Sequence, residues 1–139
     1  MNSTIRFVVV GMAIAVASGC TTTSDYELPE GARKLVSEEI TRTFSNVRED
    51  HLSMDDPGLT AVCDWKSDGD FSCNWKKGWF FRGNVTGNWY VDSDRVCVKF
   101  SEQVDGKELR CSDIYVLGER YTAINPDGST HGTFTLTPL

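Results

Sequence analysis

The segment CDWKSDGDFSC, residues 63–73, decides the fold because it predicts a β-hairpin closed by a disulfide. Its centre, residues 67–69, has the composition of a three-residue hairpin loop whose glycine takes the left-handed conformation. Counting outward from this loop places Cys63 opposite Cys73, and directly opposed residues of an antiparallel pair lie close enough for a disulfide. A two-residue loop, residues 68–69, would shift the count by one and separate the cysteines.

A second segment, CVKFSEQVDGKELRC, residues 97–111, has the same design. A five-residue loop over residues 102–106 places Ser101 opposite Lys107 and Cys97 opposite Cys111. Four cysteines allow three connectivities. The hairpin counts favour one of them, Cys63–Cys73 together with Cys97–Cys111, and such bridges are expected in an oxidising compartment.

A zinc site is the competing interpretation of these cysteines. Their intervening spacings do not match the C-x2-C type that metal sites favour. The two histidines, His51 and His131, are far apart in the sequence and belong to no local cluster. We therefore expect no metal and no cofactor.

Helical spacing of apolar residues precedes the first hairpin. The positions that recur between residues 32 and 50 are Leu35, Val36, Ile40, Phe44 and Val47. Ser37, followed by two glutamates, has the character of a helix cap, so the helix can start there with residues 32–36 as its approach. The turn-forming residues 55–59 end the helical region.

From Leu59 onward, short β-prone runs alternate with turn signals. The expected strands are residues 60–66, 71–76, 79–85, 87–92, 95–101, 107–116, 119–125 and 130–136. One helix followed by hairpin-linked strands predicts a mainly β fold of the α+β kind: a small antiparallel meander, closed or partly closed into a barrel, with the helix plugging or flanking it. Residues 32–139 are expected to form this single domain. Trp89 is expected at the barrel floor, with Gly87 allowing close backbone approach.

The first twenty residues have the layout of a secretory signal peptide. Arg6 precedes an apolar run, residues 7–17, which is too short to be a good membrane-spanning helix. The letters ASGC, ending at Cys20, resemble the lipobox of bacterial lipoproteins, although Ala17 stands where leucine is usual. The resemblance implies a signal peptide over residues 1–19, a lipid (palmitate) on Cys20, and a flexible tether over residues 20–31. Ordinary cleavage that leaves a free Cys20 is the alternative.

The class also implies an address. A lipid-anchored chain would face the periplasm within the bacterial cell envelope, and Thr21, where a sorting aspartate would stand, favours the outer membrane. Several acyl chains hold a protein stably on a membrane, whereas a single one does so only marginally.

A further resemblance covers about residues 35–136. The segments TGNWYVDSDRVCVKF and LRCSDIYVLGERYTAINPDGSTHGTFTL resemble small exported bacterial proteins grouped as domain-of-unknown-function family 995. Those proteins also open with a short helix that bears a Glu-Ile pair, matched here by Glu39 and Ile40. The family carries no catalytic residues to transfer, so the resemblance informs fold and address. The segment GNWYV is also similar to the Gly-x-Trp of lipocalins, which are ligand-binding barrels.

Charge and motifs exclude several classes of function. The net charge of −6 argues against nucleic acid, whose phosphates need clustered lysine and arginine. No nucleophile motif is present, and the acidic pairs at residues 55–56 and at residues 68 and 70 lie on turns, where we expect solvated side chains. We therefore expect a protein that is not an enzyme.

One stretch, NWKKGWFFRGN (residues 74–84), combines aromatics and cations in an otherwise acidic chain. Its candidate binding residues are Trp75, Lys77, Trp79, Phe81 and Arg82. Such side chains form partner-binding patches or rest on membrane or glycan surfaces; the alternative is that both faces of the strand are buried. The sequence thus favours a module that binds an envelope protein or glycan, inhibitors included. A lipocalin-like carrier of small hydrophobic ligands is the alternative, and it requires a cavity of a few hundred cubic ångströms, about the lower range of ligand pockets.

Overall fold

The computed structural model describes residues 26–139. The expected signal peptide, residues 1–19, and Cys20 lie outside the described residues, as does the first part of the expected tether, up to residue 25. The rest of that tether, residues 26–31, forms coil and a turn, with no helix or strand.

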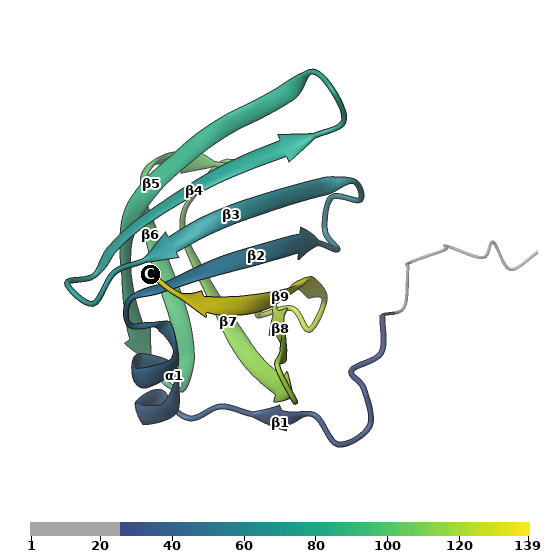
Figure 1. Cartoon of the computed structure of the whole chain (residues 1–139), viewed down its shortest axis with the longest axis vertical. Coiled ribbons are helices and arrows are strands. Elements are labelled where there is room, and N and C mark those ends of the chain that lie inside the picture. The colour runs from purple at the N-terminus through teal and green to yellow at the C-terminus, as the bar shows by residue number, and fades with distance from the viewer. Residues whose placement is uncertain (1–25) are drawn as a thin grey trace, which may run out of the picture.

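The described chain forms one short helix and an antiparallel barrel (Figure 1). In chain order the elements are β1 (Arg33–Lys34), α1 (Ser37–Phe44), β2 (Val47–Ser53), β3 (Leu59–Trp65), β4 (Asp70–Lys77), β5 (Phe81–Asp92), β6 (Arg95–Val104), β7 (Lys107–Leu117), β8 (Arg120–Ile124) and β9 (Thr130–Pro138). Each strand from β2 to β8 pairs with its successor, and β9 pairs with β2, which closes an eight-stranded barrel. The short β1 adds to β7 beyond the start of β6. The predicted fold class is confirmed.

Both predicted disulfides are confirmed. Cys63 bonds to Cys73 and Cys97 bonds to Cys111, each from directly opposed positions. The first hairpin has the predicted loop, with Gly69 at a φ of 94°.

The loop of the second disulfide hairpin differs from the prediction. Only residues 105–106 form the turn, both with positive φ, and Val104 rather than Ser101 lies opposite Lys107. A bulge between Lys99 and Val104 absorbs the extra residues of β6, so the cysteine register survives although the predicted five-residue loop was wrong.

The helix is shorter than its apolar pattern predicted. It starts at Ser37 as expected but ends at Phe44, and residues 47–53 form β2, a strand that the sequence did not predict. The inward positions of β2 are Glu49, His51 and Ser53, which are polar and buried. A strand with a polar buried face does not show the apolar alternation by which strands are recognised.

The helix cap and the fifth strand also differ in detail. Ser37 is the first helical residue rather than the cap, and its hydroxyl donates to Asp94 at 2.7 Å. The two strands expected over residues 79–92 are one strand, β5, which starts at Phe81 and leaves Trp79 in the preceding turn. Gly87 lies within β5, where a Cβ would come 2.2 Å from the carbonyl oxygen of Lys99, so close backbone approach is confirmed.

The helix closes one end of the barrel. Phe44, 1% exposed, points into the barrel and meets the Trp65 ring edge-on, with centroids 4.7 Å apart. Trp89 is buried beside them, as expected, and donates its indole N–H to the carbonyl of Lys66 at 2.7 Å. Because strands alternate in direction, the loops after β2, β4, β6 and β8 gather at the opposite end, which we call the mouth (Figure 1).

Candidate functional site: the barrel lumen

The barrel is hollow toward its mouth. A cavity of about 650 Å³ lies inside the mouth half of the barrel, within the range of about 300–1,000 Å³ typical of small-molecule sites. Its walls are formed by His51, Ser53, Asp55, Asp56, Leu59, Ala61, Cys73, Trp75, Lys77, Phe81, Val85, Phe100, Gln103, Val104, Asp105, Arg110 and His131. Apolar side chains such as Val85 and Phe100 line the cavity together with polar and charged ones. Some of the charged ones, Asp55, Asp56 and Asp105, come from the loops at the mouth.

The deepest polar group is the carboxylate of Glu49, which is buried with two partners. It accepts a hydrogen bond from the indole N–H of Trp65 at 2.7 Å and contacts Nδ1 of His51 at 2.7 Å. Nε2 of His51 is buried and forms no hydrogen bond with any of residues 26–139.

His131 makes a second histidine–carboxylate pair nearer the mouth. Its Nδ1 donates to Asp55 at 2.6 Å, and a guanidinium nitrogen of Arg110 donates to its Nε2 at 3.3 Å. An imidazole that accepts at one nitrogen and donates at the other is neutral.

The pKa directions agree with this arrangement. Burial lowers the pKa of His131, and the charges of Arg110 and His51 add to the effect, which outweighs the opposing hydrogen bond to Asp55. For Asp55, burial alone would raise the pKa, but hydrogen bonds from His131 and Asn125 outweigh burial and hold it below its ordinary value. The part of the cavity near the mouth therefore favours neutral His131 and ionised Asp55.

The two histidine rings lie side by side, with centroids 5.0 Å apart. The expectation that His51 and His131 are unclustered was wrong, because closure of the barrel makes β2 and β9 neighbours. Asp55 lies in the exposed bend after β2, as expected of a turn residue, and its carboxylate also bonds to His131 and Asn125. No group of three or more histidine, cysteine, aspartate and glutamate side chains within residues 26–139 is placed to hold a metal ion.

No family model, curated protein or solved structure matches this chain. The function proposed below therefore depends on the geometry of the lumen and not on any similar protein. In the part of the chain that the structure describes, no helix has the length and apolar character to cross a membrane.

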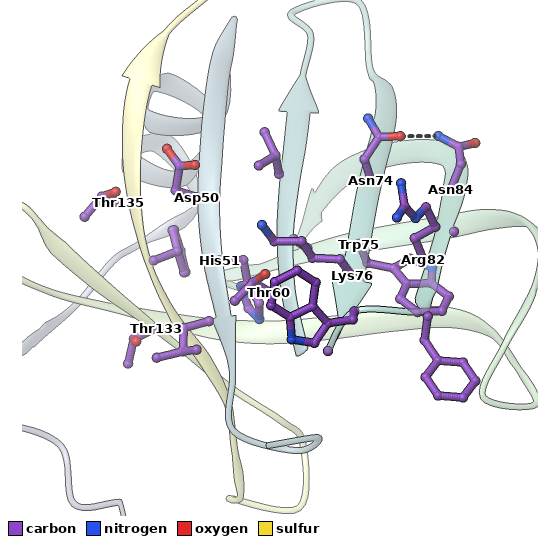
Figure 2. Close-up of a pocket in the computed structure, with 18 of the residues that line it drawn as sticks. Asp50, His51, Thr60, Asn74, Trp75, Lys76, Arg82, Asn84, Thr133 and Thr135 are labelled. Atoms are coloured by element: carbon purple, nitrogen blue, oxygen red, sulfur yellow. Dashed lines mark hydrogen bonds between the residues drawn. The ribbon is translucent and has the colours of Figure 1, made fainter. Parts of the chain in front are cut away.

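The candidate binding stretch divides between two surfaces. Three of its residues, Trp75, Lys77 and Phe81, line the lumen, and Lys77 forms an ion pair with Asp56 at the mouth. Arg82 lines a second, open hollow of about 1040 Å³, formed by β2 to β5, β8 and β9, to which Trp75 and Phe81 also contribute. Figure 2 is a close-up of this hollow. Its labelled polar lining residues are Asp50, His51, Thr60, Asn74, Lys76, Arg82, Asn84, Thr133 and Thr135, with Asn84 donating to Asn74 at 3.3 Å.

The remaining residue of that stretch, Trp79, is on the rim of the second hollow, with its side chain in solvent. The alternative interpretation, in which both faces of the stretch are buried, is therefore wrong for the turn. Arg110 and Phe100 line the lumen from β7 and β6, and neither was predicted from the sequence as a site residue. One feature of the sequence could have indicated a polar interior. Polar residues stand at every second position of a strand-length segment, at positions 49, 51 and 53.

The histidine–carboxylate pair predicts a pH-dependent stability. Because the pKa of His131 is lower in the folded chain than in the unfolded one, the unfolded chain binds the proton first as the pH falls. The stability that is fully present above about pH 6.5 should therefore decline as the pH falls toward the folded-state pKa of His131. Denaturant titrations from pH 8 to pH 5 measure this slope, and His131→Gln, which cannot titrate, should flatten it.

The matched control for this slope is Asp127→Asn. The pKa of this exposed carboxyl is held low by the Ser129 hydroxyl and backbone N–H, so it does not titrate in this range. An unchanged slope in His131→Gln would show that His131 does not control acid sensitivity above pH 5.

Proposed function

We propose that this protein is a ligand-binding barrel of the bacterial cell envelope, which holds a small apolar or amphipathic molecule in its lumen. The observation that carries the proposal is the cavity of about 650 Å³ that opens at the mouth of the barrel and is lined by inward-facing side chains. A small β-barrel is compatible with a binding module of either kind considered from the sequence. The hollow interior favours the lipocalin-like carrier over a module with a filled barrel.

The lining indicates the chemistry of the ligand. Val85, Phe100 and Val104 give the cavity an apolar wall that suits an acyl chain or a ring system. Arg110 lies over the ring of Phe100, with its central carbon 5.6 Å from the ring centroid, and has a distant carboxylate partner, Asp105, at 3.5 Å. A ligand carboxylate or carbonyl can take a charge-assisted hydrogen bond from this guanidinium.

The same lining supports binding rather than catalysis. The cysteine of the wall, Cys73, is in a disulfide, and the hydroxyl of Ser53 accepts a hydrogen bond from the backbone N–H of Asp56. Arg110 occupies Nε2 of His131, the position at which a catalytic histidine would take a proton from a nucleophile. We therefore assign the polar cluster the task of orienting a ligand.

The envelope address is supported by the sequence. An apolar run, two small residues and Cys20 precede the barrel, and disulfides form in oxidising compartments such as the periplasm. A lipid on Cys20 would tether the barrel to the outer membrane, with the folded part facing the periplasm.

Binding of two fluorescent probes tests the proposal. A chain starting at Thr21 keeps every core residue, from Leu35 to Phe134. It should bind both the neutral probe N-phenyl-1-naphthylamine and a fatty acid with a pendant fluorophore. Val85→Trp fills the lumen and should weaken both by about 10-fold or more, the equivalent of about 1.4 kcal/mol. Arg110→Met should weaken the fatty acid by about 10-fold and leave the neutral probe unchanged.

The matched control is Thr86→Trp, which adds the same side chain to the outward face of the same strand. Thermal melting confirms that each variant is folded. Equal binding by Val85→Trp and the unmodified chain would place the probes outside the lumen and contradict the proposal.

A further inference from the structure

The turn between β4 and β5 holds consecutive aromatic side chains in solvent. Trp79, Phe80 and Phe81 are 90%, 88% and 69% exposed. Isolated apolar residues on a surface are ordinary, whereas contiguous large ones mark an interaction site. We call these three residues the aromatic tip.

The aromatic tip projects from the barrel. The pairing of β5 with β6 ends at Gly87 opposite Phe100, so residues 81–86 pair only with β4. Figure 1 shows the resulting two-stranded hairpin reaching beyond the neighbouring strands at the mouth. A convex, narrow tip buries little area against a flat protein surface, but it can insert into a fluid bilayer interface, where tryptophan is enriched.

Two cations stand directly behind the aromatic tip. Lys76 and Arg82 are paired across β4 and β5, and both are exposed. Neither forms an ion pair with any side chain of residues 26–139. An apolar tip backed by unpaired cations matches the polarity of a phospholipid surface, with acyl chains beneath phosphate groups.

The start of the described chain determines how far the barrel can lie from a lipid on Cys20. Tyr26 contacts Thr122 of β8, with their hydroxyls 3.5 Å apart. In Figure 1 this first described segment lies at the lower right of the view and the turn between β4 and β5 at the upper right, so both lie toward the mouth of the barrel. The six-residue step from Cys20 to Tyr26 spans at most about 20 Å, so a lipid on Cys20 would hold the barrel close enough for the tip to reach the bilayer.

We propose that the aromatic tip inserts into the headgroup region of a phospholipid bilayer and turns the mouth of the barrel toward it. Phe81 belongs both to the tip and to the wall of the lumen. Insertion therefore places the entrance of the cavity beside the membrane. The proposal stands without the ligand-binding function, because it depends on exposure, shape and charge at the hairpin turn.

Quenching of tryptophan fluorescence by brominated lipids tests the insertion. The full chain is reconstituted into phosphatidylcholine vesicles whose acyl chains carry bromine at carbons 6 and 7. We expect quenching of the unmodified chain and loss of at least half of it in Trp79→Phe, since Trp65 and Trp89 are buried in the barrel and Trp75 is half-buried in the wall of the lumen. Phe80→Ser should reduce the quenching of Trp79 by loosening insertion. Leu117→Ser, an exposed apolar position outside the tip, should leave it unchanged.

Three outcomes would overturn the proposal. Quenching that is absent, or equal in Trp79→Phe and the unmodified chain, would show that the tip stays out of the bilayer. A dimer in sedimentation that dissociates in Phe80→Ser would assign the tip to a second copy of the chain. Probe binding to the lumen is measured on the same variants, and because Trp79 and Phe80 do not line the cavity, its retention separates failure of insertion from failure of ligand binding.

Discussion

A chain carrying Phe44→Ala is expected to lose about 3–5 kcal/mol of its free energy of unfolding. Phe44 is the residue through which α1 closes the barrel. Its ring packs against Trp65, Trp89 and Phe134, with centroid distances of 4.7, 6.4 and 5.9 Å. Strands fixed by two disulfides and a closed ladder cannot collapse into the space that the ring leaves, so the cavity cost adds to the transfer cost.

Guanidinium denaturation of the Phe44→Ala chain measures this loss. The control is Arg42→Ala, which truncates an exposed side chain on the same helix and should change the free energy by about 0.5 kcal/mol or less. A Phe44→Ala chain within about 1 kcal/mol of the unmodified protein would show that α1 covers the barrel without closing it.

The second large effect is expected on removal of the disulfides. Cys63→Ala with Cys73→Ala, or Cys97→Ala with Cys111→Ala, should each lower the free energy of unfolding by about 2–4 kcal/mol. The bridges span 10 and 14 residues, so a chain-entropy argument gives similar contributions. For a folded part of this size, each kilocalorie corresponds to about 4–8 °C in melting temperature.

The control for the disulfides is Cys20→Ser. Both bridges are formed without Cys20, so this change should leave the denaturation midpoint unaltered under oxidising conditions. A shift as large as that of a bridge variant would mean that Cys20 exchanges with one of the four bonded cysteines.

The local features of the fold could be predicted from the sequence because they are encoded locally. A glycine-bearing loop sets the register of a hairpin, and the cysteines of residues 63–73 report that register directly. In the second disulfide hairpin the same reasoning predicted the wrong loop, because a bulge lies after Lys99. The turn at residues 105–106 is shorter than predicted, and the bulge takes up the remaining residues, so the cysteines stay opposed. A count between cysteines cannot separate those two contributions.

The lumen could not be predicted, for a different reason. Asp55, Arg110 and His131 come from the loop after β2 and from β7 and β9, and only closure of the barrel brings them together. Strand β2 adds to the difficulty, since its buried side chains are polar and its sequence follows a helix without an apolar alternation. Whether a barrel is hollow depends on the volumes of its inward side chains, and the spacing of apolar residues along the sequence does not reveal how well those volumes fill the interior.

The pairing of β2 with β9 has a consequence for the order of folding. It places His51 opposite Phe134, and β2 and β9 are the neighbouring strands of the barrel that lie farthest apart along the chain. Contacts so far apart carry the greatest loop-closure entropy and slow folding. Neither disulfide spans this junction, so covalent cross-linking can speed the hairpins but not the final closure. The barrel cannot close until β9 pairs with β2, and until then the contact between His131 and Asp55 cannot form.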